Sequence, residues 1–262
     1  APQSQLPDQG SQVAGVMGGA PVSADQNWAR AIVLVLASNG ERCTGALIQP
    51  DVILTAAHCV EFGEDNVSFT IRFRKTAGAN HLVLLESAEA REVLAHDDYA
   101  AAGNVVINDI ALIALKNPAP EGVVPLELAP SVRGLSSRDP LLAIGYGKTK
   151  DFHIAESDSD VLNSVAVFAA SRIDRDPVPA MTDQSELILV SQKNGKGICS
   201  GDSGGPLLRW QDGRYQILGV ANFVMNAMVR DRRCSGYSAF RSVVAYQDWI
   251  QRSIAHLGSK TP

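Results

Sequence analysis

Residues 197–208, GICSGDSGGPLL, place Ser203 directly after an aspartate and among four glycines. Glycine loses more conformational freedom on folding than any other residue, so this cluster predicts a backbone held in an unusual conformation. A serine displayed on such a backbone is a candidate nucleophile. Serine alone is a weak nucleophile, and it needs a base to take its proton and a third group to orient that base. The chain must therefore supply those two groups elsewhere.

Two other motifs provide a candidate base and its orienting acid. Of the five histidines, His58 has the most distinctive surroundings, LTAAHC at residues 54–59, where the adjacent Cys59 can fix the backbone beside it. Asp109 begins the apolar run DIALIAL, residues 109–115. A carboxylate that leads an apolar strand into the core is unfavourable unless it is hydrogen-bonded, and an imidazole N–H is a suitable donor.

Composition narrows the class of protein. The 262-residue chain contains 23 Lys and Arg against 28 Asp and Glu, a net charge of -5, so nucleic acid is not expected as a partner. No apolar stretch approaches the ~18 residues that a membrane span requires, so no membrane span is expected. No metal or cofactor motif is visible. The acidic stretch 156–160 is interpreted as a solvated loop rather than a calcium site.

The cysteines and the N-terminal composition concern processing and compartment. None of the four cysteines forms a CxxC pair, which favours two disulfides over a zinc site. Disulfides persist outside a reducing cytosol, so we expect a secreted or periplasmic protein. Residues 1–15 contain four glutamines and no aromatic residue, and they are predicted to be a flexible leader. The four cysteines are Cys43, Cys59, Cys199 and Cys234.

Short apolar runs separated by turn signals make up most of the chain, which is typical of many short strands. The Pro-rich stretch 116–130 interrupts them and is interpreted as a crossing between two halves. Residues 242–258 have helical spacing and a glycine at their close. The chain is therefore predicted to be all-β, in two halves, with one C-terminal helix. The expected strands lie in 31–37, 45–57, 67–73, 81–87, 109–115, 140–147, 164–170, 186–192, 205–210 and 215–224.

LTAAHC, NDIALIAL and GDSGGP, in this order, resemble the motifs of the trypsin/chymotrypsin-like serine peptidases, and the resemblance covers nearly the whole chain. It implies an all-β, trypsin-like fold of two six-stranded antiparallel β-barrels with a C-terminal helix. It also implies one peptidase domain, residues 16–262, that follows the leader. The two barrels are expected at 16–128 and 129–262.

The resemblance implies a role for each motif residue. Ser203 attacks the scissile carbonyl to form an acyl-enzyme, His58 takes and returns the proton, and Asp109 orients the imidazole. The backbone N–H groups of Gly201 and Ser203 form the oxyanion hole. No cofactor is required. The implied disulfides are Cys43–Cys59, beneath the histidine, and Cys199–Cys234, around the specificity pocket.

The same resemblance places a specificity pocket. Its base corresponds to Gly197, where tryptic members have Asp, so cleavage after Lys or Arg is not expected. Ile198 is bulky, and Val224 stands on the wall where glycine would leave the pocket mouth open. Ser238 corresponds to the second wall, beyond a loop at 225–233 that is interpreted as lengthened. This uncharged, narrowed pocket predicts cleavage after small aliphatic residues.

The resemblance has two further implications, one for a residue that departs from the family pattern and one for activation by cleavage. Asn222 replaces the serine that the family usually has near the triad aspartate, and we expect it to tune activity; Phe223 follows it in the wall. VMGG, residues 16–19, resembles the Ile-Val-Gly-Gly start of active family members. Cleavage between Gly15 and Val16 is therefore expected to free an α-amine that pairs with Asp202 and converts a zymogen.

Alternatives to a triad peptidase differ in class. GDSGG also fits the nucleophile elbow of α/β-hydrolases, but that fold places its histidine after the serine, and only His256 follows Ser203. A catalytically weak homologue that acts as a binding module is the main alternative, and an esterase on the same fold is another. For a peptidase, the expected partners are protein or peptide substrates and proteinaceous inhibitors.

Overall fold

Runs of Val, Ile and Leu bounded by turn residues form most of the strands, as their β-propensity predicts. The computed structural model describes residues 16–23, 25–63, 66–77, 81–102, 105–147, 161–173, 176–177, 182–192, 194–225 and 234–259. The predicted leader, the acidic stretch 156–160 and nearly all of the loop 225–233 lie outside the described residues.

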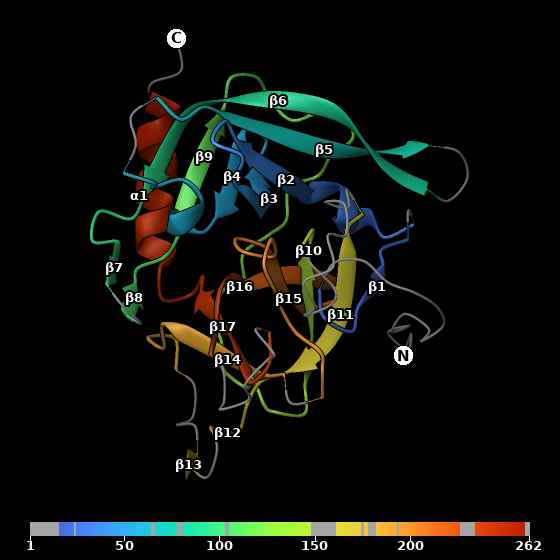
Figure 1. Cartoon of the computed structure of the whole chain (residues 1–262), viewed down its shortest axis with the longest axis vertical. Coiled ribbons are helices and arrows are strands. Elements are labelled where there is room, and N and C mark those ends of the chain that lie inside the picture. Colours follow the sequence, from blue (N-terminus) through green and yellow to red (C-terminus); the bar gives the residue numbers. More distant parts are fainter. Residues whose placement is uncertain are drawn as a thin grey trace.

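The N-terminal half forms the predicted closed barrel of six antiparallel strands, drawn in blue and green in Figure 1. β4 and β9 are buried along their whole length, so their sequences are continuous apolar runs rather than alternating ones. Ile53, Phe73 and Ile113 are fully buried, and Ile53 and Ile113 are paired on one face of β4 and β9. The strands around the barrel are β2 (Ile32–Ala37), β3 (Arg42–Gln49), β4 (Val52–Thr55), β9 (Ala111–Leu115), β6 (His81–Ala95) and β5 (Phe69–Ala77).

The C-terminal half forms a seven-stranded antiparallel sheet, so the predicted second six-stranded barrel is not confirmed. The additional edge strand is β1, which the segment just before the first barrel contributes by pairing with β11. Ala169, directly after β11, and Val190 of β14 form one isolated bridge between the two ends of the sheet. The order is β1 (Ala20–Pro21), β11 (Asn163–Phe168), β10 (Pro140–Gly145), β15 (Pro206–Gln211), β16 (Arg214–Met225), β17 (Tyr237–Ser242) and β14 (Leu187–Ser191).

The C-terminal helix α1 (Gln247–Ser259) lies beside β9 and covers the first barrel (Figure 1). It begins five residues later than the predicted start at 242, because residue 242 still belongs to β17 and turns follow it. Among the described elements, none is a helix with the length and apolar character of a membrane span. Short elements are η1 (Asn27–Ala31), η2 (Ala57–Cys59), β7 (Ala100–Ala102), β8 (Val105–Ile107), β12 (Arg172–Ile173) and β13 (Asp176–Pro177).

The Pro-rich segment 116–130 connects the two sheets and bonds to both. The Leu126 N–H donates to the Leu47 carbonyl of β3 at 2.9 Å, and the Ala129 N–H donates to the Ile217 carbonyl of β16 at 2.8 Å. These bonds fix one sheet against the other along the connection. The connection therefore holds the two sheets, and with them the sequence motifs, in a defined relative position.

Candidate active site

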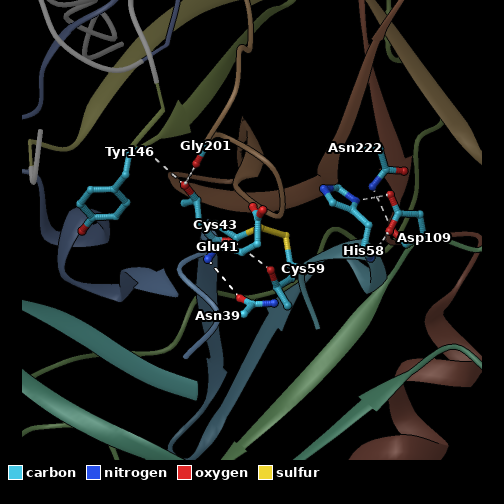
Figure 2. The surroundings of a disulfide bond; sticks show 11 residues. Asn39, Glu41, Cys43, His58, Cys59, Asp109, Tyr146, Gly201 and Asn222 are labelled. Atoms are coloured by element: carbon cyan, nitrogen blue, oxygen red, sulfur yellow. Dashed lines mark hydrogen bonds and ion pairs between the residues drawn. A yellow bond between two sulfur atoms is a disulfide. The ribbon is translucent and has the colours of Figure 1, made fainter. Parts of the chain in front are cut away.

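His58 and Asp109 lie together because β4 and β9 are neighbouring antiparallel strands. β4 ends at Thr55 and β9 begins at Ala111, and these two residues are paired. His58 follows β4 in η2, and Asp109 precedes β9. Figure 2 shows the two side chains pointing toward each other. The pairing of the strands thus brings together motifs that are 51 residues apart in the sequence.

Asp109 makes two hydrogen bonds with the same histidine. Its Oδ1 accepts the His58 backbone N–H at 2.9 Å, and its Oδ2 lies 2.8 Å from His58 Nδ1. Because a carboxylate only accepts hydrogen bonds, the neutral imidazole has its proton on Nδ1 and leaves Nε2 as an acceptor. The Asp109 side chain is 1% exposed, whereas that of His58 is 33% exposed. A ring held in this tautomer can take a proton at Nε2 from a nearby nucleophile.

Asn222 lies beside Asp109, as the sequence predicted, but the sequence did not predict which atom of Asp109 it would bond to. Its Nδ2 donates to the backbone carbonyl of Asp109 at 2.9 Å, rather than to the carboxylate (Figure 2). Its buried Oδ1 has no hydrogen-bond partner among the described residues. The register of β16 against β17 shifts between Ala221 and Phe223, so Asn222 lies at a bulge. Bulges are frequent beside active sites because they redirect a side chain.

Ser203 lies on a loop that is pressed against the first barrel. Gly204 has a φ of +78°, and a Cβ there would come within 2.1 Å of Thr55 Oγ1 and 2.3 Å of the Thr44 carbonyl oxygen. The Ser203 carbonyl accepts the Thr44 N–H at 2.8 Å. Within the described residues, Ser203 and His58 are not joined by a hydrogen bond. Catalytic hydrogen bonds are often long without substrate and tighten in the complex.

Thr44 is a site residue that the sequence analysis missed. Its fully buried Oγ1 donates to the Gly201 carbonyl at 3.0 Å and accepts the Tyr146 N–H at 3.1 Å. Figure 2 draws these two bonds as dashed lines from Gly201 and Tyr146. The available signal was a polar residue beside Cys43 in an otherwise buried strand, because a buried hydroxyl needs partners. Thr44 thus ties the barrel to the loop that contains Ser203.

Asp202 is fully buried beneath this loop. Its carboxylate accepts backbone N–H groups from Cys199 and Gly147, both at 2.8 Å, and from Val16. Burial raises the pKa of Asp202 from its ordinary value of 3.8 to about 7, against the opposing effect of these three hydrogen bonds. Val16 is also fully buried and has a φ of 57°, a conformation that is unfavourable for a β-branched residue. The two residues predicted to act in activation are therefore in contact.

The residues predicted to form the pocket also come together. Ile198 donates its N–H to Ser238 Oγ at 3.2 Å, and Ser238 is paired with Val224 across β16 and β17. Phe223 is half-buried beside Val224 on β16. Gly197 has a φ of 157°, and its N–H donates to the Met17 carbonyl at 3.2 Å. This arrangement places Gly197, Ile198, Val224 and Ser238 on adjoining segments.

Both disulfides implied by the resemblance are present. Cys43–Cys59 joins β3 to η2 beside His58 (Figure 2), and Cys199–Cys234 joins the segments before Ser203 and before β17. In the part of the chain that the structure describes, the ligand atoms of Cys43, Cys59 and His58 lie within 4.8 Å of one another. Because both sulfurs are bonded to each other, neither is a thiolate that could bind a metal ion.

Comparison with known proteins agrees with this geometry. A family model described as Trypsin matches residues 16–250. Brachyurin from Leptuca pugilator is 34% identical over 221 residues, which are 80% of this chain and 86% of that protein. Chymotrypsin-like elastase family member 1 from Homo sapiens is 28% identical over 263 residues, 92% of each chain. CLIP domain-containing serine protease B4 from Anopheles gambiae is 28% identical over 273 residues, 91% of this chain and 70% of that protein.

Proposed function

This chain belongs to the trypsin family and is a serine endopeptidase, and on that basis we propose that Ser203, His58 and Asp109 form its catalytic triad. The main support is the pair of hydrogen bonds from His58 to Asp109, which fixes the ring so that its neutral tautomer presents Nε2 as an acceptor. A binding module without activity would have no need of a histidine held in this tautomer at a partly exposed position.

In the proposed reaction, Ser203 Oγ attacks the carbonyl carbon of the substrate while His58 Nε2 takes its proton. Asp109 stabilises the imidazolium that results. The protonated ring then gives its proton to the leaving amine, the C–N bond breaks and an acyl-enzyme remains. Water, activated by the same nitrogen, releases the acid product and regenerates the serine.

The proposed oxyanion hole consists of the backbone N–H groups of Gly201 and Ser203. Gly201 has a φ of +93°, which a residue with a side chain rarely adopts, and a Cβ there would come within 2.8 Å of Gly147 Cα. Thr44 holds the carbonyl of Gly201 from the opposite direction. Donors fixed before the reaction stabilise the developing charge without reorganising at that moment.

The proposed substrates are proteins or peptides with a small aliphatic residue at P1, the residue whose carbonyl is attacked. Gly197 gives the pocket base no charge for a Lys or Arg side chain. Ile198 and Val224, together with Ser238, narrow the space above it. A pocket of this kind discriminates by length, because each additional methylene must find room.

The proposed active form begins at Val16, and the chain with residues 1–15 is a zymogen. Asp202 has no cationic side chain paired with it among the described residues, although burial makes its ionised form unfavourable. The Val16 nitrogen already lies on this carboxylate. Cutting the bond between Gly15 and Val16 would turn that nitrogen into a charged amine and supply the missing partner.

Organisation and location are part of the same proposal. The proposed peptidase domain spans 16–262, with halves at 16–128 and 129–262, and the C-terminal half is proposed to be the second barrel. Two disulfides support secretion or a periplasmic location, because such bonds persist in oxidising compartments. Proteinaceous inhibitors are proposed as further partners, since they would occupy the same cleft as substrates.

The proposal is tested by labelling the purified chain with a fluorophosphonate and sequencing both the labelled peptide and the N-terminus. Label on Ser203 together with cleavage of peptide substrates would support the triad. Label on another serine, or cleavage of esters without cleavage of peptides, would contradict it. The N-terminal sequence shows at the same time whether the reactive form begins at Val16.

A further inference from the structure

The side chain of Gln192 occupies the space that a side chain at position 197 would take. Gln192 directly follows β14, and it is 1% exposed. A Cβ built on Gly197 would come within 2.3 Å of Gln192 Cγ and Nε2, and within 2.5 Å of its Cδ. These distances are shorter than any real contact, so the amide of Gln192 fills the place left by the glycine.

Gln192 is hydrogen-bonded to two of the segments that form the predicted pocket. Its Nε2 donates to the carbonyl of Ile198 at 2.7 Å, and its backbone N–H donates to the carbonyl of Gly236 at 2.7 Å. Ile198 and Ser238 are joined in turn by a hydrogen bond. The amide therefore lies where the segment before Ser203, the segment before β17 and the end of β14 meet.

The Oε1 atom of Gln192 is buried and has no hydrogen-bond partner among the described residues. A buried polar atom without a partner is costly, so it is uncommon in a region whose only role is packing.

From this geometry we propose that the Gln192 amide is the floor of the specificity pocket and sets its depth, so that small, uncharged P1 residues are selected. This inference rests on the proposed function and names the residue behind its substrate preference. Gly197 contributes by having no side chain, which leaves room for the amide. The floor is neutral, so it offers no counter-charge to Lys or Arg.

A substrate series tests the depth on the unmodified protein. Peptides that differ only at P1, from alanine through 2-aminobutyrate and norvaline to norleucine, lengthen the side chain by one methylene at a time. We expect kcat/KM to rise over the first members and then fall at least tenfold once the side chain reaches the amide. A continuous rise through norleucine would place the floor lower and overturn the proposal.

Two variants test the identity of the floor. Gln192→Ala deepens the pocket, and we expect kcat/KM for P1 Leu or Met to rise about tenfold relative to P1 Ala. Gln192→Glu keeps the shape and adds charge, so cleavage after Lys or Arg should rise at least tenfold relative to P1 Ala. The matched control is Gln49→Glu, the same change at an exposed position at the end of β3, which should leave the P1 profile unaltered.

Three outcomes separate this inference from the proposed function. The rate of labelling by a fluorophosphonate without a P1 side chain reports whether each variant still has a formed catalytic site. A protein of native sequence, cut before Val16, that neither labels nor cleaves any peptide would contradict the proposed function itself. An active protein whose variants label normally but keep the original P1 profile would overturn the role of Gln192 alone. If both variants fail to label, the substrate series on the unmodified protein decides.

Discussion

The closed barrel and the seven-stranded sheet hold their parts of the candidate site in different ways. His58 and Asp109 lie within three residues of the paired ends of β4 and β9, and their geometry follows from regular strand pairing. Ser203 lies on a loop whose neighbours Gly201 and Gly204 both have positive φ angles. That loop is held by contacts with residues distant in the sequence rather than by strand pairing.

The difference suggests a division of labour. The proposed base and its orienting acid lie at the ends of paired barrel strands. The proposed nucleophile and oxyanion donors depend on three further contacts: Thr44 on the Gly201 carbonyl, Gly147 on Asp202, and Val16 on the same carboxylate. Activity should therefore be more sensitive to those contacts than the folding of the barrel is.

The largest effect should come from removing a member of the triad from either region. Ser203→Ala should abolish labelling and lower kcat by about 10⁵–10⁶-fold, and His58→Ala should cost about as much, because the two act as a unit. The double variant should be little worse than either alone, which steady-state kinetics would measure. Ser68→Ala, at an exposed position before β5, is the control. Additive losses would mean that the two residues do not work together.

The second-largest loss of activity should come from the contact between Val16 and Asp202, which belongs to the Ser203 loop of the seven-stranded sheet. A chain verified to begin at Ala1 should have a kcat/KM about 10²–10³-fold below that of a chain beginning at Val16, the scale of losing one oxyanion donor. Asp202→Asn should lower the activity of the cut chain by a similar factor. The control is Asp212→Asn, at an exposed turn between β15 and β16. Full activity of the uncut chain would refute the zymogen proposal.

The pKa of Asp202 gives a prediction for stability. Because it is raised from 3.8 to about 7, the folded uncut chain retains a proton that the unfolded chain loses. The contribution of Asp202 to the free energy of unfolding of the uncut chain should therefore be fully present below pH 4 and be lost as the pH rises to about 7. Urea unfolding of the Ser203→Ala chain, which cannot digest itself, would measure this slope. Asp202→Asn should remove it, and cutting before Val16 should reduce it.

A smaller effect is expected where the two regions touch. Thr44→Val removes the hydroxyl that bonds to the Gly201 carbonyl and to the Tyr146 N–H, which should cost about 2 kcal/mol of stability. It should also lower kcat about tenfold with little change in KM, because the loop is misplaced rather than the substrate site removed. Thr44→Ser keeps the hydroxyl and should restore most of the activity. Equal losses in both variants would assign Thr44 to packing alone.

The smallest effect should come from Asn222, which bonds to the Asp109 backbone rather than to its carboxylate. Asn222→Ala should cost about 1 kcal/mol of stability and lower kcat only a few-fold. Asn222→Ser, which keeps a donor of shorter reach, is the matched comparison. A loss of kcat of about 100-fold or more in the alanine variant would show that Asn222 acts on the charge of the triad.

Sequence motifs located the catalytic candidates because each is a local signal. LTAAHC and NDIALIAL lie at strand ends. The apolar run of NDIALIAL identified β9, whereas the run 45–57 was expected as one strand and contains the end of β3 and all of β4, with a turn at residues 50–51 between them. The pairing of β4 and β9 then places His58 beside Asp109. The apolar runs indicated an all-β chain in two halves, whereas the closed barrel was expected from the family resemblance.

Other features depended on contacts that no local pattern records. β1 joins the far edge of the second sheet, so the seventh strand could not be predicted from its two residues. The side chain of Gln192 fits the space that is free because Gly197, five residues later, has no side chain, and it bonds to the carbonyl of Ile198. Asn222 reaches the Asp109 backbone because a bulge redirects it. Each outcome is set by packing between segments rather than by residue type.

The bulge at Asn222 has a consequence for how this protein can change. β16 carries Asn222, which bonds to Asp109, and, two residues later, Val224 of the proposed pocket. A mutation that shifts the strand at Val224 will also move Asn222, so the P1 preference and kcat should change together. Selection for a new substrate should therefore enrich paired substitutions at 222 and 224, whereas single changes at 224 should be lost during the early rounds.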